Sequence, residues 1–334
     1  LHLCNLALGV KEGDKVITTP ITFAASANSV LYCGGEVIFS DIDPDTYILD
    51  INKVRELLEK APKGAYNGII PVDFAGRPVN LEEFRKLADE YGLWIIEDSC
   101  HAPGGYFIDS KGMRQNCGNS QFADLAIFSF HPVKHIATGE GGMITTNRGD
   151  LYKKLLTLRT HGITKNKNEF LNSTVLANGN NDQILNYPGW YMEMQSLGFN
   201  YRLTDFQAAL GISQLTRADE GLIKRKSIAL NYYTAFKDKS FIKGQSGYLD
   251  GHAYHLYVIE VEKRLELYNF LKENNVFAQI HYIPCHLMPY YKNKGWNGWD
   301  DFLGTSKFVS FKEAKKYASS LGVNGWTQWN KYFK

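Results

Sequence analysis

The chain has 334 residues, of which 44% are hydrophobic and 22% are charged, and its 37 basic and 35 acidic residues leave a net charge of +2. This composition is typical of a globular protein with room for one large domain and a smaller one. It lacks the basic excess of nucleic-acid-binding proteins, and no apolar run approaches the ~18 residues of a membrane span. We therefore expect neither nucleic acid nor a membrane as a partner.

The first residues of the chain and its cysteines give further expectations. Residues 1–9 have the pattern of a helix entered midway and closed by a Gly C-cap, so we expect a truncated N-terminus. The number of cysteines is odd, and they are widely scattered without a Cys-x-x-Cys pair: Cys4, Cys33, Cys100, Cys117 and Cys285. This pattern argues against a disulfide framework or a metal site and favours the cytoplasm.

Strand and helix patterns alternate along the first part of the chain. Strands are expected at residues 15–19, 36–40, 68–74, 93–97, 125–129 and 142–147, and helices at 23–33, 52–61 and 80–92. The alternation predicts an α/β fold with a mainly parallel sheet flanked by helices. Ligands of such sheets bind beyond the carboxyl ends of the strands.

The second part of the chain changes character twice. A polar segment at 165–192 predicts a long functional loop, followed by helices at 204–215 and up to about residue 236. A smaller α/β unit is expected from a strand at 255–261, a helix at 264–274 and a strand at 276–282. Residues 296–334 hold four of the six tryptophans and a capping box at Ser310. The predicted domains are a large one at 1–235, an incomplete α/β small one at 236–295 and a helical tail at 296–334.

Two side chains at strand ends indicate the chemistry. Asp98 ends the apolar strand at 93–97, and Lys134 follows the next strand in a turn rich in glycine. Pyridoxal 5'-phosphate (PLP) chemistry needs a lysine that can form a Schiff base and a carboxylate that keeps the pyridine nitrogen protonated. Lys134 is therefore the predicted catalytic lysine and Asp98 the partner of the ring. The alternatives are a surface lysine in a His-rich loop and a helix-capping Asp.

Six sequence motifs occur in the order of a known family. They are Pro20-Ile-Thr-Phe-Ala-Ala, Glu97-Asp-Ser-Cys-His-Ala, Ser129-Phe-His-Pro-Val-Lys-His, Thr138-Gly-Glu-Gly-Gly, Gly198-Phe-Asn-Tyr-Arg-Leu-Thr-Asp and His281-Tyr-Ile-Pro-Cys-His. Together they resemble the fold-type I sugar-nucleotide aminotransferases of the DegT–StrS group, over residues 1 to about 295. Within that group the likeness is strongest to the transaminases of pseudaminic acid synthesis.

The resemblance implies a reaction and its partners. The expected reaction transfers an amino group from L-glutamate to a UDP-linked 4-keto-6-deoxy-N-acetylhexosamine, with PLP as cofactor, in a cytoplasmic homodimer. The alternatives are another keto sugar nucleotide, of the perosamine type or with a 3-keto group, and a non-enzymatic binding protein. The last alternative arises because the family's Ser-Gly-Thr phosphate turn does not precede Leu1, and because residues 296–334 resemble a short repeat of phage-integrase-like proteins.

The resemblance also suggests cofactor residues besides Lys134 and Asp98. Phe23 is expected to stack on the ring of PLP, His101 to contact its phenolic oxygen or pack over it, and Ser129 to donate to the phosphate. Asn200 is expected to reach the phosphate bound to the partner subunit. The other possibilities are a core aromatic for Phe23, a structural polar residue for His101 and a turn cap for Asn200.

Substrate recognition is assigned to a separate group of side chains. Arg159 and Arg202 are candidates for the glutamate carboxylate or the diphosphate, because a guanidinium suits bidentate anions. Arg202 is equally suited to bracing a dimer interface. An aromatic and imidazole cluster is the candidate for the nucleotide, with packing of the small domain as the alternative: His281, Tyr282, His286, Tyr290 and Tyr291.

Overall fold

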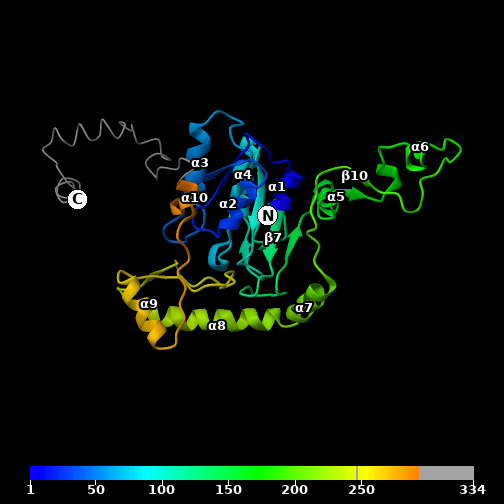
Figure 1. The fold of residues 1–334 in the computed structure, drawn as a ribbon. Helices are drawn as coiled ribbons and strands as arrows, with labels where there is room; N and C mark the ends of the chain where they lie inside the picture. The colour runs from blue at the N-terminus through cyan, green and yellow to red at the C-terminus, as the bar shows by residue number, and fades with distance from the viewer. Residues whose placement is uncertain (246, 293–334) are drawn as a thin grey trace. The chain divides into compact units, whose positions relative to one another are not determined.

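The structure, a computed structural model, describes residues 1–245 and 247–292 (Figure 1). The chain divides into two compact units with the boundary between Cys285 and His286. The predicted helical tail at 296–334, with its capping box at Ser310, lies outside the described residues. The division into domains at residues 235 and 295 stays a prediction.

A six-stranded sheet forms the centre of the first unit. Its strand order is β2-β1-β3-β4-β7-β8, and every neighbouring pair is parallel except β7 and β8. These strands are β1 (Lys15–Thr18), β2 (Glu36–Phe39), β3 (Gly68–Ile70), β4 (Trp94–Asp98), β7 (Leu125–Ser129) and β8 (Gly142–Thr145). The predicted fold class, a mainly parallel sheet flanked by helices, is confirmed.

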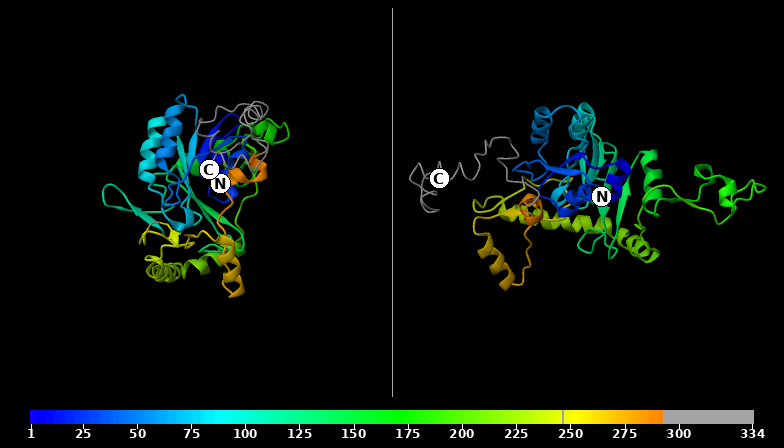
Figure 2. Two further views of the ribbon diagram at one scale, coloured as in Figure 1. Left: turned by 90° about the vertical axis from the view of Figure 1, so that its left-hand side faces the viewer. Right: turned by 45° about the horizontal axis from the view of Figure 1, so that its top comes forward.

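Helices cover both faces of this sheet (Figure 2). One face carries α3 (Ile51–Lys60) and α4 (Leu81–Tyr91), and the other carries α1 (His2–Leu8), α2 (Ala24–Leu31) and α5 (Gly149–Leu158). Side chains alternate along the strands: Ile69 packs with the first set and Ile70 with the second. Strands buried on both faces in this way are nearly all apolar, which is why they could be recognised.

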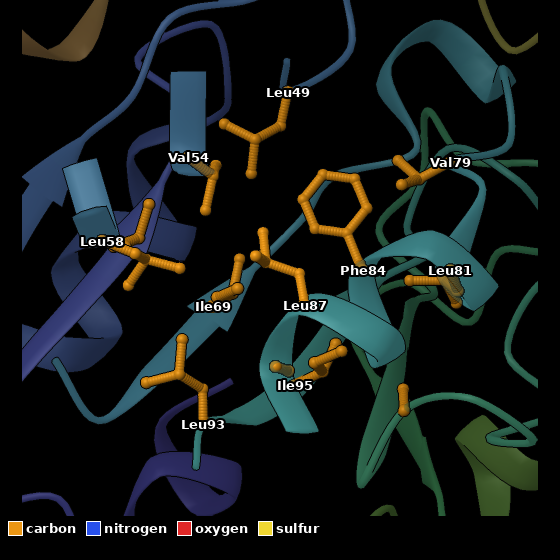
Figure 3. Packing of buried hydrophobic residues seen from close by; sticks show 13 residues of the cluster. Leu49, Val54, Leu58, Ile69, Val79, Leu81, Phe84, Leu87, Leu93 and Ile95 are labelled. Atoms are coloured by element: carbon orange, nitrogen blue, oxygen red, sulfur yellow. The ribbon is translucent and has the colours of Figure 1, made fainter. Parts of the chain in front are cut away.

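The cluster under α3 and α4 shows how tightly the sheet and helices interlock (Figure 3). Leu87 of α4 and Ile95 of β4 are fully buried, and Phe84 is 3% exposed. Closely packed interiors resist movement. The cluster therefore fixes the carboxyl end of β4, where Asp98 stands.

Further elements lie outside the central sheet and the helices that cover it. The long helix α8 (Ala218–Phe236) follows α7 (Asp205–Leu215), whose Thr204 and Gln207 form a capping box. Residues 165–192, predicted as a loop, contain two short helical segments, at 167–169 and 174–177, and extend away from the sheet (Figure 1). The remaining elements are η1 (Phe74–Gly76), β5 (Tyr106–Ile108), β6 (Arg114–Asn116), β9 (Ile163–Thr164), η2 (Lys167–Glu169), α6 (Thr174–Ala177), β10 (Glu193–Met194), β11 (Lys243–Gly244), β12 (Ile259–Glu260), α9 (Arg264–Glu273), η3 (Cys285–Leu287) and α10 (Pro289–Lys292).

The expected strands of the small α/β unit are mostly absent. Of residues 255–261 only Ile259–Glu260 pairs, with β11, and residues 276–282 form no strand. The expected helix at 264–274 is present as α9. Strands need a ladder partner for their backbone groups, and the part of the chain described here supplies none beside residues 276–282.

None of the helices described combines the length and the hydrophobicity that a membrane-spanning segment needs.

Candidate active site

A large cavity opens at the carboxyl ends of β4 and β7. Its volume is about 1160 Å³, and its wall includes residues from α1, α2, β4, β7, β8 and α5. The cavity is large enough for a cofactor together with a substrate. Its position agrees with the rule that ligands of parallel sheets bind beyond the strand ends.

Asp98 is the last residue of β4 and lines this cavity. Each oxygen of its carboxylate accepts a hydrogen bond. The side chain is 5% exposed. Its Oδ2 accepts a hydrogen bond from Ser26 Oγ at 2.6 Å, and its Oδ1 accepts one from the backbone N–H of Cys100 at 3.2 Å. Ser26 is oriented in turn by Thr22, whose hydroxyl lies 2.8 Å from Ser26 Oγ. The carboxylate is therefore fixed in one orientation.

Lys134 lies in the same cavity, in the turn that follows β7. Its backbone N–H donates to the carbonyl of His131 at 2.9 Å, which shapes the turn. Burial lowers the pKa of Lys134, although the nearby Cys100 and Asp98 oppose part of this shift. A lowered pKa increases the share of neutral amine, and only the neutral form can act as a nucleophile.

Two aromatic rings line the cavity as well. Phe23 stands at the N-cap of α2, and 65% of it is exposed. The ring centroid of Tyr282 lies 6.4 Å from that of Phe23. An exposed phenyl ring in the wall of a cavity offers an apolar face to a flat ligand. The alternative of a core aromatic does not apply to Phe23.

His101 is almost fully buried at the cavity wall. Its Nδ1 accepts a hydrogen bond from the backbone N–H of Ala75 at 3.3 Å, so a neutral His101 carries its proton on Nε2. Burial, together with the charge of Lys134 and neighbouring histidines, lowers the pKa of His101 far below its ordinary value. The ring is therefore a neutral hydrogen-bond donor.

Ser129 and Arg159 also line the cavity, as does His281. Ser129 ends β7, and its Oγ accepts a hydrogen bond from the backbone N–H of His131 at 3.3 Å. Arg159 follows the last residue of α5. The wall thus contains an amine, a carboxylate, a hydroxyl and a guanidinium around apolar surface.

The structure does not bring every predicted site residue to this cavity. Asn200 and Arg202 lie outside its wall; Arg202 Nε donates to Asn200 Oδ1 at 3.0 Å, and both side chains are exposed. His286 and Tyr290 belong to the second unit. Of the side chains predicted to bind the nucleotide, His281 and Tyr282 are therefore the ones that line the cavity.

The cavity wall also contains residues that the sequence did not mark as part of the site, among them Ser26, Cys100 and His255. Ser26 lies one helical turn after Phe23, and that spacing is the only sequence signal that pointed to it. His255 stands far along the chain in a segment predicted as a strand, so nothing local marked it.

Comparison with known proteins identifies the family. Residues 1–310 match the DegT/DnrJ/EryC1/StrS aminotransferase family. The chain belongs to this family. The aminotransferases of this family depend on PLP, and the chain is accordingly an enzyme of the transferase class.

Relatives and solved structures support the membership. The UDP-4-amino-4,6-dideoxy-N-acetyl-beta-L-altrosamine transaminase of Campylobacter jejuni is 37% identical over 87% of this chain and 71% of its own length. GDP-perosamine synthase of Caulobacter vibrioides is 32% identical over 87% of this chain and 71% of its own length. Among solved structures, Helicobacter pylori PseC, an aminotransferase involved in the biosynthesis of pseudoaminic acid, is 30% identical, with a TM-score of 0.73 over 90% of this chain and 76% of that one. The sugar aminotransferase Spr1654 of Streptococcus pneumoniae in its PMP form is 26% identical, with a TM-score of 0.72 over 88% and 74%.

The cavity of this aminotransferase has the donor set that PLP requires. Lys134 supplies the amine, Asp98 a buried carboxylate and Phe23 an exposed aromatic face in one cavity. When bound, PLP supplies a ring that accepts the electron pair released at the reacting carbon. With PLP bound, Asp98 would hold the proton on the ring nitrogen, and Lys134 would supply the amine that links to PLP and moves a proton; these roles stay predictions.

A second group of polar side chains lies buried beside β4. Asp73, Glu97 and Cys117 approach one another closely enough to be candidate ligands for a metal ion. Backbone groups already occupy three of the four carboxylate oxygens: Asp73 Oδ1 accepts from Val79 N at 2.8 Å, and both oxygens of Glu97 accept from Gly118 N, whereas the buried Asp73 Oδ2 has no hydrogen-bond partner among the described residues. The absence of a metal stays a prediction.

Burial makes this group sensitive to pH. It raises the pKa of Asp73 to about 6, and burial together with Asp73 raises the pKa of Glu97 well above its usual range. Groups with a raised pKa in the folded state stabilise the fold at low pH, and this contribution is lost as the pH rises through that pKa. A shift of about two units corresponds to on the order of 3 kcal/mol.

We therefore predict that the free energy of unfolding of Glu97→Gln, relative to that of the wild type, increases as the pH rises from 4 to 8, because the variant lacks the carboxyl group whose pKa is raised by folding. Urea titrations at several pH values measure the effect. Glu83→Gln, at an exposed position of α4, is the control and should follow the wild type. If the free energy of unfolding changed equally with pH in Glu97→Gln and in the wild type, the prediction would be contradicted.

Proposed function

We propose that the enzyme transfers an amino group from L-glutamate to the C4 keto group of a UDP-linked 4-keto-6-deoxy-N-acetylhexosamine, in the synthesis of a surface or flagellar sugar such as pseudaminic acid. The observation that carries the proposal is the meeting of Lys134 and Asp98 in one cavity. The C. jejuni transaminase and PseC, which are named for this chemistry, support the choice of sugar.

The cavity offers groups for both substrates. Arg159 is an exposed residue that lines the cavity. Its guanidinium can bind the side-chain carboxylate of glutamate or a diphosphate. His281 and Tyr282 offer imidazole and phenol groups to the nucleotide. We keep His286 and Tyr290 as candidate nucleotide contacts, and Arg202 as a candidate anion contact.

The proposed assembly is a cytoplasmic homodimer. Asn200 is exposed and does not line the cavity of its own chain. This placement supports the proposal that Asn200 contacts the cofactor phosphate bound by the partner subunit. Apolar side chains exposed nearby, such as Phe206 at 91% and Leu197 at 75%, support an interface at this surface.

A second candidate substrate is a GDP-linked 4-keto-6-deoxyhexose. It is favoured by the 32% identity to GDP-perosamine synthase over 87% of this chain. A 3-keto sugar nucleotide remains a third possibility. The base of the nucleotide and the position of the keto group distinguish these candidates.

The test is a substrate panel with the PLP-loaded full chain and L-glutamate. Mass spectrometry of the sugar nucleotide and measurement of 2-oxoglutarate report the reaction. Conversion of the UDP-linked 4-keto sugar in preference to the GDP-linked and 3-keto sugars is expected. Preference for the GDP-linked sugar would favour the perosamine-type reaction. Bound PLP without conversion of any sugar would favour a non-enzymatic binding protein.

A further inference from the structure

The segment that carries Lys134 is closed by its own backbone. Phe130, at its start, donates from its N–H to the carbonyl of Gly141 at 2.9 Å, and its own carbonyl accepts from the N–H of Thr138 at 2.9 Å. The two ends of the segment therefore meet, and Lys134 stands midway between them. We call residues 130–141 the lysine loop. The position of the amine in the cavity depends on how this loop is held.

The N-terminal part of α7 lies close to the end of the lysine loop (Figure 1). A Cβ at Gly141, whose φ is 150°, would come within 2.8 Å of Cδ1 of Leu203, which precedes the helix. A Cβ at Gly211 of α7 would lie 3.2 Å from Cγ2 of Thr138. A glycine on each side thus permits the close approach of loop and helix.

Gln207 joins α7 to the loop. It lies four residues before Gly211, so the two share one face of the helix. Gln207 Nε2 donates to the carbonyl oxygen of Glu140 at 2.7 Å. The hydroxyl of Thr138 donates to the same oxygen at 2.7 Å. The carbonyl of residue 140 is therefore a point at which the helix and the lysine loop are bonded.

The other end of the Gln207 amide caps the helix. Its Oε1 accepts from the backbone N–H and from the hydroxyl of Thr204, each at 3.0 Å. The backbone N–H of Gln207 donates to Thr204 Oγ1 at 3.3 Å, which completes the capping box. A backbone N–H only donates and a carbonyl only accepts, so these partners define which end of the amide faces the loop. One side chain thus performs two tasks with two different atoms.

We propose that Gln207 is a positioning residue for Lys134: its amide N–H bonds the lysine loop to α7 and so holds the amine where it reaches the cofactor aldehyde. The inference depends on the proposed role of Lys134 as the lysine that binds PLP. Gln207 lies outside the cavity wall, so it acts through the loop. Holding a reacting group in place speeds its reaction, because less freedom is lost on the way to the transition state.

The substitution Gln207→Glu separates the two tasks. A carboxylate accepts the same two hydrogen bonds from Thr204, and Glu is a preferred residue at this position of a capping box. An ionised carboxylate has no hydrogen to donate, so the bond to the carbonyl of Glu140 is lost. The helix should therefore keep its cap while the loop is released. Gln121→Glu, at an exposed position between β6 and β7, makes the same chemical change elsewhere and is the control.

The bond between helix and loop is tested on the cofactor-free full chain by hydrogen–deuterium exchange with mass spectrometry. In Gln207→Glu, peptides that cover residues 130–141 should exchange roughly 3- to 10-fold faster than in the wild type, as expected for one lost hydrogen bond. Peptides of α7 should exchange at the wild-type rate. Unchanged exchange in the loop overturns the proposal. Faster exchange in both the loop and α7 also overturns it, because the effect then comes from the helix.

The consequence for Lys134 is tested by adding PLP to the cofactor-free enzyme. The absorbance of lysine-bound PLP reports the formation of the covalent link. Gln207→Glu should form this link roughly 3- to 10-fold more slowly than the wild type and Gln121→Glu. The maximal rate of transamination should fall by a similar factor, with little change in the half-saturating concentration of L-glutamate. Faster exchange of the loop without slower formation of the link overturns the positioning role.

These results are distinguishable from a failure of the proposed function. Borohydride reduction and peptide mass spectrometry locate the link, and a link to another lysine overturns the role of Lys134 and with it this inference. If the link forms at Lys134 and Gln207→Glu slows it, the positioning role stands, even where the enzyme converts no UDP-linked sugar and the substrate proposal fails. Circular dichroism and thermal unfolding show that both variants fold.

Discussion

Lys134→Ala is expected to lower the rate of transamination by at least about 10²–10⁴-fold, which is the usual contribution of one positioned acid–base group. The variant loses both the covalent link to the cofactor and the amine that moves the proton. Its cavity remains, because Asp98, Phe23 and His101 are held by other elements: β4, α2 and η1. PLP should therefore still bind, without a covalent bond.

Two measurements check this result independently of turnover. Borohydride reduction followed by peptide mass spectrometry should find the cofactor on the peptide containing Lys134 in the wild type, and on no peptide of the variant. The absorbance of lysine-bound PLP should be lost at the same time. Lys111→Ala, at an exposed position between β5 and β6, is the control. It should keep both the labelled Lys134 peptide and the absorbance of lysine-bound PLP. A full rate in Lys134→Ala would exclude this lysine from the chemistry.

The pH dependence of the reaction should reflect the environment of this amine. Because burial lowers the pKa of Lys134, the neutral form should begin to dominate at a lower pH than for a lysine in water. His101 and His255 remain neutral over the same range, since burial holds the pKa of each far below its ordinary value. We therefore expect that neither imidazole takes up a proton in this range and that Lys134 is the group that transfers it.

The sheet could be predicted, and Asp98 and Lys134 could be placed beside its strand ends, because the sequence signals for both are local. The strand that ends at Asp98 is an unbroken apolar run with a carboxylate at its end, as a central strand of a parallel sheet requires. Lys134 stands next to a strand end and close to several glycines. The order of strands and helices then brings both to the same edge of the sheet.

The remaining site residues depend on contacts between distant segments. Ser26 meets Asp98 across 72 residues of chain, and His255 meets His101 across more than twice that distance. No pattern within a short window records such contacts. The strand expected at residues 276–282 failed for a related reason, because a strand forms only where a neighbour supplies hydrogen bonds.

Asp98→Asn should lower the maximal rate by about 10²–10³-fold, the effect of removing one electrostatic partner of a developing charge. Asparagine has nearly the same shape and can still pair with Ser26 Oγ, which lies 2.6 Å from Oδ2. The change therefore removes the negative charge and leaves the packing intact. Without that charge the ring nitrogen of PLP is no longer held protonated, so the half-saturating concentration of L-glutamate should change much less than the rate.

The cofactor itself provides the discriminating control. PLP methylated on its ring nitrogen carries a permanent positive charge, so it should restore a large part of the activity of Asp98→Asn and add nothing to the wild type. Ser26→Ala, which removes one hydrogen bond but keeps the carboxylate, should cost about 10-fold or less. If the methylated cofactor fails to raise the rate of Asp98→Asn, then Asp98 serves mainly to hold α2 through Ser26, and the proton on the ring must be kept by another group of the cavity wall.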